Sequence, residues 1–232
     1  MMLENIYIIH YSKLTERKES IKKYFDKEYL NLNFIEKYDQ ENIISRKDLP
    51  KKYVPDKVLY NEKVKLWGQN AVSFNELNNA EISCEMKHLE ALNMISSSNK
   101  DFGLILEDDV IPTDMEFEKI INNIINKNID WDVLFLGTGI GENFIKSKIS
   151  IYDKILKRNI VTPTHPATNC AEAYLIKKDA AANIYKNIQE FNMAWDWELA
   201  YSFKELSMNI KWYIPPLFYQ GSVSGEFKSA LR

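Results

Sequence analysis

One uninterrupted apolar run that ends in three adjacent carboxylates constrains the fold most strongly. Residues 102–106 read Phe-Gly-Leu-Ile-Leu, and Glu107, Asp108 and Asp109 follow directly. A short continuous apolar run is typical of a strand that is buried on both faces of a parallel sheet. Ligands of such sheets bind beyond the carboxyl ends of the strands. The run therefore predicts a central strand that delivers three carboxylates to a ligand site.

Strand-like and helix-like segments alternate along the rest of the chain. Apolar residues between Ile82 and Ile95 recur every three to four positions, which is the period of one helix face. The alternation predicts an α/β fold of one domain, with a mainly parallel central sheet and helices on both faces. The expected helices are 18–25, 82–95, 117–125 and one from near Asp179, and the expected strands are 5–10, 32–39, 102–106, 131–137 and 171–176.

Composition and charge argue against several classes of protein. The formal net charge is −3, and the basic residues are scattered and mostly Lys, whereas nucleic-acid-binding domains carry a basic stripe. No nucleic-acid partner is expected. The apolar run at the N-terminus is too short for a signal peptide or a membrane span, so a cytoplasmic location is expected. Cys84 and Cys170 match no zinc spacing, and we expect both to be reduced.

The acidic triplet points to a bound cation. Close like charges repel and raise one another's pKa, so a divalent ion such as Mg²⁺ or Mn²⁺ would stabilise them, together with substrate phosphates. Alternate residues of an extended segment point the same way, which places Glu107 and Asp109 on one site and Asp108 on the other side. A solvated acidic turn, with one carboxylate capping the following helix, is the alternative interpretation.

Several separated segments together resemble glycosyltransferase family 25, the bacterial lipooligosaccharide and collagen galactosyltransferase group. The segments occur in the family's order, and together they extend over nearly the whole chain. Three residues depart from the family's pattern, namely Ser83, Lys87 and Glu172. The matching segments are IYIIHYSKLTERKESI, EKYDQEN at 36–42, SCEMKHLEAL at 83–92, LILEDDV at 104–110, WDVLFLG, AYLIKKDAA at 173–181, WDWEL at 195–199 and IPPLFYQ at 214–220.

The resemblance implies a nucleotide-diphospho-sugar transferase fold of the GT-A type. It implies inverting transfer of a hexose from a UDP-sugar to a hydroxyl of a glycan or glycoprotein acceptor, with Mn²⁺ or Mg²⁺ on the Glu-Asp-Asp motif. Residues 1–140 would then bind the nucleotide sugar, and residues 141–232 would face the acceptor. Whether the protein forms a homodimer is left undecided by the sequence.

The same resemblance suggests site residues in three groups. Glu107 and Asp109 are the expected metal ligands, and Asp196, with Glu198 as the second choice, is the expected catalytic base. The sequence also permits plainer roles: a core position for His88, a surface charge for Arg17, a structural hydrogen bond for Asp108 and a helix cap for Asp196. The expected nucleotide-sugar contacts are His10, Tyr11, Arg17, Asp39, His88, Glu107, Asp108 and Gln220.

Two other classes of function compete with the transferase. A sugar nucleotidyltransferase would use the same carboxylates, but it would normally need a Gly-rich phosphate loop, and the seven glycines show no such spacing. A catalytically inactive carbohydrate- or nucleotide-sugar-binding protein of the same fold is the other alternative. It would not require three adjacent carboxylates at a strand end.

Overall fold

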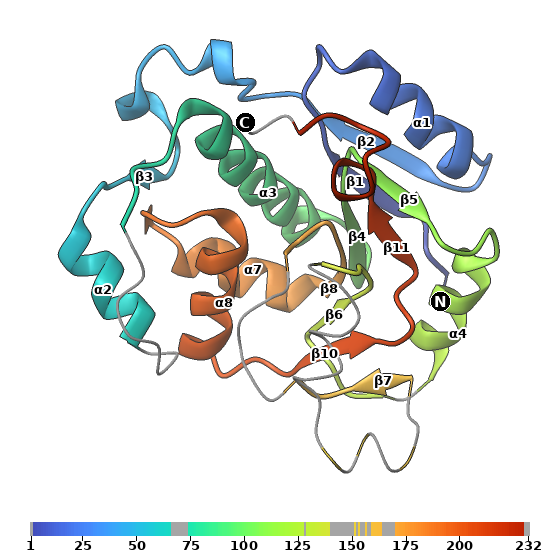
Figure 1. Cartoon of the computed structure of the whole chain (residues 1–232). Coiled ribbons are helices and arrows are strands. Elements are labelled where there is room, and N and C mark those ends of the chain that lie inside the picture. Colours follow the sequence, from blue (N-terminus) through green and yellow to red (C-terminus); the bar gives the residue numbers. More distant parts are fainter. Residues whose placement is uncertain are drawn as a thin grey trace.

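The computed structural model describes residues 2–65, 74–127, 129–139, 151, 153, 156, 159–163 and 170–229. Within these residues, helices flank both faces of a seven-stranded sheet (Figure 1). No helix in this part of the chain is long and apolar enough to cross a membrane. The strands lie in the order β2 (Asn31–Ile35), β1 (Asn5–Ile9), β4 (Phe102–Glu107), β8 (Ala173–Lys177), β6 (Val133–Phe135), β10 (Ile210–Tyr213) and β7 (Ile160–Val161).

The predicted α/β fold with a mainly parallel sheet is confirmed. Strands β2, β1 and β4 are parallel to one another, and β6 and β10 run in the same direction. Strands β8 and β7 run the opposite way. Because β8 is antiparallel, its amino end lies at the edge of the sheet where β4 and β6 end. The residues just before β8 therefore join the predicted ligand edge.

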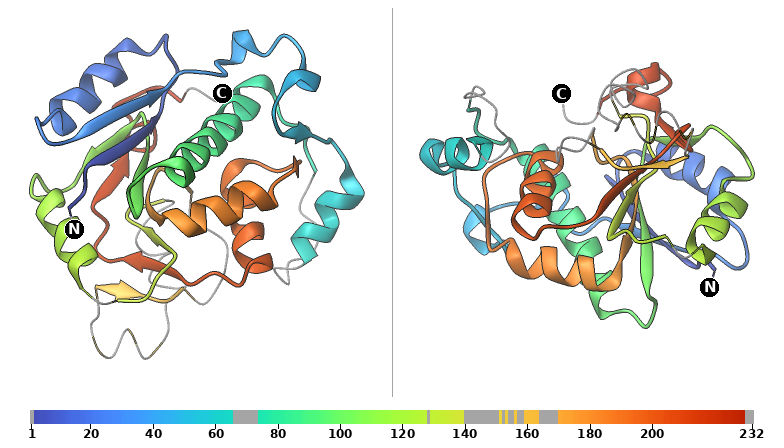
Figure 2. Two further views of the ribbon diagram at one scale, coloured as in Figure 1. Left: turned by 180° about the vertical axis from the view of Figure 1, so that it is seen from behind. Right: turned by 90° about the horizontal axis from the view of Figure 1, so that it is seen from below.

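Side chains that alternate along the strands form two apolar layers. On β4, Ile105 packs in the layer under α3, whereas Leu104 and Leu106 pack in the layer under α1. Helices α3 and α7 lie side by side over the first face (Figure 2). The helices of the first layer are α3 (Asn79–Ser97), α7 (Lys178–Asn187) and α8 (Trp195–Glu205), and those of the second are α1 (Thr15–Phe25) and α4 (Phe117–Asn126).

Helix α3 begins earlier than its apolar period suggests because it has a capping box. The Asn78 side chain accepts hydrogen bonds from the N–H groups of Ala80 and Glu81, and the Glu81 side chain accepts one from the Asn78 N–H. These contacts satisfy N–H groups that the first helical turn leaves without partners. The cap fixes where the helix starts, and therefore which of its residues reach the strand ends.

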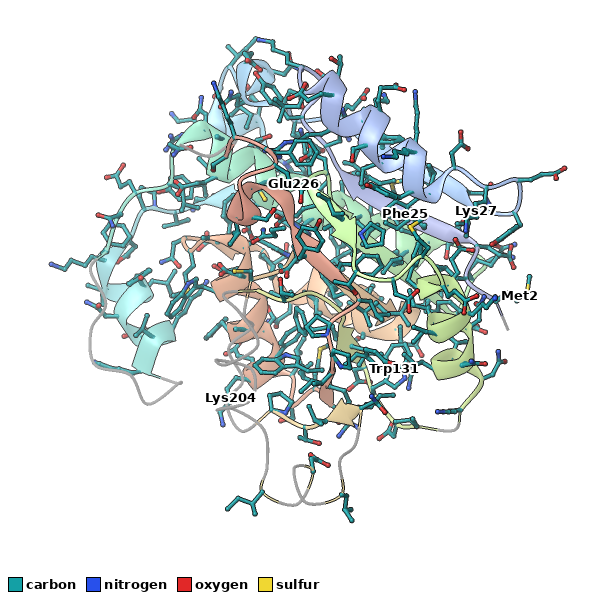
Figure 3. The ribbon with its side chains drawn as sticks, turned by 45° about the vertical axis from the view of Figure 1, so that its right-hand side comes forward. Met2, Phe25, Lys27, Trp131, Lys204 and Glu226 are labelled. Atoms are coloured by element: carbon teal, nitrogen blue, oxygen red, sulfur yellow. The ribbon has the colours of Figure 1, made fainter. Side chains whose placement is uncertain are left out.

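Short elements complete the fold. Phe25 of α1 lies beneath its helix (Figure 3), where its ring contacts Phe117 and Phe218 with centroids 5.0 and 5.9 Å away. The predicted strand at 32–39 ends at Ile35, and Tyr38 adopts a φ of 74°. The described residues also form α2 (Lys57–Lys65), α9 (Gly221–Ser224), the 3₁₀ turns Gln40–Asn42 and Arg46–Asp48, and the strand pairs β3 (Lys52–Tyr53) with β9 (Glu190–Phe191) and β5 (Val110–Pro112) with β11 (Phe218–Gln220).

Gly103 allows α3 to pack closely on β4. A Cβ atom at this position would lie 2.7 Å from Cγ1 and 2.8 Å from Cδ1 of Ile95, and 2.8 Å from the Tyr7 ring. We expect Gly103→Ala to lower the free energy of unfolding by about 1–3 kcal/mol, because an added methyl group overpacks the layer. Urea denaturation measures the change. Ile95→Val removes one contacting atom, so the double variant should lose less stability than the sum of the single changes, and strict additivity would contradict the packing account.

Candidate active site

The candidate site lies where the carboxyl ends of β1 and β4 meet the end of β11. In the register of the sheet, Ile9 of β1 is paired with Glu107 of β4. The pairing of β11 with β5 places Gln220 opposite Val110, directly after the acidic triplet. A pocket opens between these strand ends and α3, and its wall includes His10, Tyr11, Arg17, Cys84, Lys87 and Glu107.

Asp108 is held by the protein itself. Its Oδ1 accepts a hydrogen bond from Arg17 Nη1 at 2.6 Å, and its Oδ2 lies 2.8 Å from His10 Nδ1 and 3.1 Å from the Tyr11 N–H. His10 and Tyr11 follow β1 directly, and Arg17 belongs to α1. Burial alone would raise the pKa of Asp108, but His10 and Arg17 outweigh burial and hold the pKa below its usual value. Asp108 is therefore an ionised carboxylate that ties the end of β4 to β1 and α1.

Asp39 and Lys87 form a second buried pair on the pocket wall. Lys87 Nζ donates to an Asp39 carboxylate oxygen and to the His10 carbonyl, the latter at 2.5 Å. The other Asp39 oxygen accepts from the Ser12 hydroxyl and N–H. Lys87, one of the departures from the family pattern, thus puts a positive charge where the pocket begins.

The hydrogen-bond partners of Glu107 and Asp109 are not the residues that hold Asp108. Glu107 accepts a hydrogen bond from Gln220 Nε2 at 3.2 Å, and Asp109 Oδ2 lies 3.3 Å from the Ser222 N–H. Asp109 Oδ1 is buried and has no hydrogen-bond partner in the described part of the chain. The structure therefore brings Gln220 to Glu107 and leaves one buried Asp109 oxygen without a hydrogen-bond partner among the described residues.

Four carboxyl groups influence one another at this edge of the sheet. Burial, followed by the charges of Asp109 and Glu172, raises the pKa of Glu107 well above its usual value. Burial also raises the pKa of Glu172 to about 7 and that of Asp196 to about 6. The pKa of Asp109 is raised as well, first by burial. Each group is thus easier to protonate than in water, and a cation would relieve the same unfavourable energy.

Glu172 enters the site from the amino end of β8 and was not predicted as a site residue. Its carbonyl accepts a hydrogen bond from the Glu107 N–H at 2.8 Å, and its Oε1 accepts one from the Gly139 N–H at 2.5 Å. A Cβ atom on Gly137 would lie 2.2 Å from Glu172 Oε1, so only glycine leaves room for this side chain. The signal for Glu172 in the sequence is a single carboxylate near the start of the otherwise apolar predicted strand 171–176.

His88 lies on α3 behind the pocket wall. Its side chain is fully buried, and its ring stacks on that of Trp195 with centroids 4.8 Å apart and an interplanar angle of 11°. Nδ1 lies 3.0 Å from the Tyr174 hydroxyl, and Nε2 lies 3.6 Å from Glu107 Oε1. Burial lowers the pKa of His88 well below its usual value, so the ring is neutral. The described residues that line the pocket do not include His88, although it was expected to contact the diphosphate.

The two residues expected to act as the base have different surroundings. Asp196 lies in the first turn of α8, where its Oδ1 accepts from the Trp197 N–H at 3.0 Å, and its charge raises the pKa of both Glu107 and Glu172. Glu198 is buried in an ion pair with Lys63 of α2. The structure brings Asp196, and not Glu198, to the group of carboxylates.

The C-terminal segment covers part of the site. Arg17 Nη2 donates to the Lys228 carbonyl, and the guanidinium carbon lies 5.5 Å from the centroid of the Phe227 ring. The Gly221 N–H donates to the Asp109 carbonyl at 2.7 Å. Arg17 is therefore buried in the pocket wall and is not a surface charge of its helix.

Together these features define an α/β protein with a pocket and a group of buried carboxylates at the carboxyl edge of its sheet. The chain belongs to glycosyltransferase family 25 (LPS biosynthesis protein), whose sequence profile matches residues 3–198. It is therefore a member of a glycosyltransferase family, as the sequence motifs predicted.

Comparisons with other known proteins give distant similarities. No curated protein matches the chain. Among solved structures, the galactosyltransferase LgtC in complex with donor and acceptor sugar analogues has a TM-score of 0.39 and 10% identity, over 90% of this chain and 73% of that chain. A nucleoside-diphosphate-sugar pyrophosphorylase from Vibrio cholerae RC9 has a TM-score of 0.33 and 14% identity, over 91% of each chain.

The raised carboxyl pKa values predict an unusual dependence of stability on pH. A folded-state pKa above the unfolded value means that the folded protein binds more protons, so stability falls as the pH rises between the two values. For Glu172 this range extends from 4.5 to about 7. We expect the metal-free protein to lose on the order of 1–3 kcal/mol of unfolding free energy through this group between about pH 5 and pH 8.

Urea denaturation in the presence of a chelator, repeated across this pH range, measures the effect. Glu172→Gln keeps the acceptor for the Gly139 N–H but does not titrate. The variant should therefore show a shallower loss of stability than the wild type. Equal slopes for the two proteins would show that Glu172 does not carry a raised pKa.

Proposed function

We propose that the chain is an inverting, metal-dependent glycosyltransferase that moves a hexose from a UDP-sugar to a hydroxyl of a glycan or glycoprotein acceptor. One observation carries the proposal: Glu107, Asp109, Glu172 and Asp196 converge beside a pocket whose wall contains Arg17. Uncompensated carboxylates beside a pocket whose wall also contains Arg17 and Lys87 suit a ligand that brings both a cation and phosphates. Membership of a glycosyltransferase family supports a nucleotide sugar as the ligand that brings the phosphates.

Glu107 and Asp109 are the residues proposed to hold Mn²⁺ or Mg²⁺. Their oxygens are the hard ligands that these ions prefer, and the buried Asp109 Oδ1 has no partner in the described residues. Gln220, which donates to Glu107, would orient this carboxylate. When bound, the ion supplies charge that offsets the negative charge developing on the departing diphosphate.

The donor pocket is proposed to lie in the 1–140 part of the chain. Asp108 fixes His10, Tyr11 and Arg17 at its wall, so these groups would meet the nucleotide already oriented. Asp39 would contribute through Lys87, which it holds at the pocket, because both Asp39 oxygens already accept hydrogen bonds. Preorganised groups lose little entropy on binding, which favours affinity for the donor.

Asp196 is proposed as the catalytic base, on the 141–232 part that would face the acceptor. A pKa of about 6 suits a group that must be ionised at neutral pH and still accept a proton from the acceptor hydroxyl. Glu198 is held by Lys63, and we propose that it positions α8 and does not exchange protons with the acceptor. His88 would not contact the donor directly. It would position Glu107, which lies 3.6 Å from its Nε2, and Trp195, on which its ring stacks.

Cation-dependent binding of UDP tests the metal and donor sites together. Isothermal titration should show weak UDP binding with a chelator and tighter binding with Mn²⁺, since diphosphate and carboxylates repel until an ion bridges them. Asp109→Asn should keep the fold and lose the effect of Mn²⁺. Affinity that is the same with and without a chelator would refute the metal-dependent part of the proposal.

Turnover tests the base and separates the enzyme from an inactive binding protein. Turnover is measured as the rate of UDP release, with the UDP-hexose that supports the highest rate. Asp196→Asn should lower kcat by about 10²–10⁴, the usual range for loss of a general base, while UDP affinity stays near that of the wild type.

Glu198→Gln is the matched control on the same helix turn. It should reduce stability more than it changes kcat, because it weakens a buried ion pair. Normal turnover by Asp196→Asn together with a large loss in Glu198→Gln would transfer the role of base to Glu198. Mn²⁺-dependent UDP binding without turnover by the wild type would favour the inactive binding protein.

A further inference from the structure

We propose that Cys84, His88 and Glu107 form a binding site for a borderline-soft divalent cation, of which Zn²⁺ is the best match. One ligand atom from each residue lies within 4.8 Å of the other two. The set differs in chemistry from the all-oxygen site proposed at Glu107 and Asp109, although it shares Glu107. It concerns binding of the ion by the chain and does not depend on sugar transfer.

Helix geometry brings the first two ligands together. Cys84 and His88 are four residues apart on α3, so both side chains lie on one face of the helix. Glu107, at the end of β4, supplies the third ligand, and its Oε1 lies 3.6 Å from His88 Nε2. Zinc bonds of about 2.0–2.3 Å in a tetrahedron place neighbouring ligand atoms roughly 3.3–3.7 Å apart. The separation between His88 Nε2 and Glu107 Oε1 already lies in this range, and the other separations, none above 4.8 Å, would have to close by at most roughly 1–1.5 Å.

His88 has the surroundings of a metal ligand. Its side chain is completely buried, and Nε2 has no hydrogen-bond partner in the described part of the chain. Contact with the Tyr174 hydroxyl at Nδ1 and stacking on Trp195 fix the ring, so Nε2 points toward Glu107. A hydrogen bond at one ring nitrogen typically orients the other toward a metal. A buried nitrogen without a partner is unfavourable, and a bound cation would supply the missing interaction.

The donor set and the access route both favour zinc. Thiolate, imidazole and carboxylate ligands together are typical of Zn²⁺, whereas Mg²⁺ and Mn²⁺ prefer oxygen ligands alone. Cys84 and Glu107 also line the pocket, so an ion can enter from solvent. Three protein ligands would leave a fourth position of the ion for water or an anion. The sequence shows no zinc spacing because the third ligand comes from a different element.

Substitution of Co²⁺ for Zn²⁺ tests the site directly. The full chain is stripped with a chelator, dialysed and titrated with Co²⁺ while the near-ultraviolet and visible absorption is recorded. We expect one equivalent of Co²⁺ to bind with a thiolate-to-metal charge-transfer band, and Zn²⁺ to displace it. Cys84→Ser should abolish the band, and His88→Gln should weaken Co²⁺ binding at least tenfold. Cys170→Ser is the matched control and should keep the band.

Loss of the band in Cys170→Ser, or its persistence in Cys84→Ser, would overturn the proposal, as would Co²⁺ binding by the wild type without a thiolate band. If Cys84→Ser does not fold, His88→Gln and the wild type decide through their thermal melting. Zn²⁺ should raise the melting temperature of the wild type and not that of His88→Gln, and equal shifts would refute the site. Asp109→Asn should keep the Co²⁺ band while losing the effect of Mn²⁺ on UDP binding, which separates failure of this site from failure of the proposed function.

Discussion

The buried contact between Asp108 and Arg17 determines how the rest of the site is arranged. Three adjacent carboxylates cannot all be ionised in a buried position unless something compensates them. The protein compensates one of them with Arg17 and His10, and this contact ties the ends of β4 and β1 to α1. The pKa of Asp108 is lowered, while the pKa values of Glu107 and Asp109 on either side are raised. The triplet therefore combines one carboxylate whose charge the protein compensates with two carboxyl groups whose pKa values stay raised.

Strand β8 adds a further buried carboxyl group, Glu172, to the carboxylates at this edge of the sheet. Its antiparallel direction brings Glu172 next to Glu107, and Gly137 leaves the space that the Glu172 side chain occupies. A buried carboxyl group lowers stability unless it is protonated or paired. Sites that break the rules of stability in this way are usually sites of function. The concentration of raised pKa values at one edge of the sheet thus supports a role in ligand binding more strongly than the triplet does alone.

Local sequence patterns predicted the framework, and contacts between distant segments decided the details of the site. The period of α3 and the apolar run of β4 depend on neighbouring residues, so both elements and the position of the triplet were predicted. The reversal of β8 and the arrival of Glu172 depend on how strands pair across the sheet, which no local pattern records. Glu198 illustrates the same limit, because Lys63, its partner, is 135 residues away in the sequence. Cys84 and His88 have helical spacing, but only the folded chain brings Glu107 to them.

The stacking of Trp195 on His88 connects the two parts of the site. Trp195 begins α8 and lies one residue before Asp196, whereas His88 belongs to α3, whose face forms the pocket wall. The two rings are nearly parallel and fully or almost fully buried, so α8 cannot shift without disturbing His88 and its approach to Glu107. The ion pair between Lys63 and Glu198 also holds α8 to α2. The carboxylate proposed as the base is therefore positioned by the same packing that orients the imidazole beside the acidic triplet, and a change in one part should be transmitted to the other through α8.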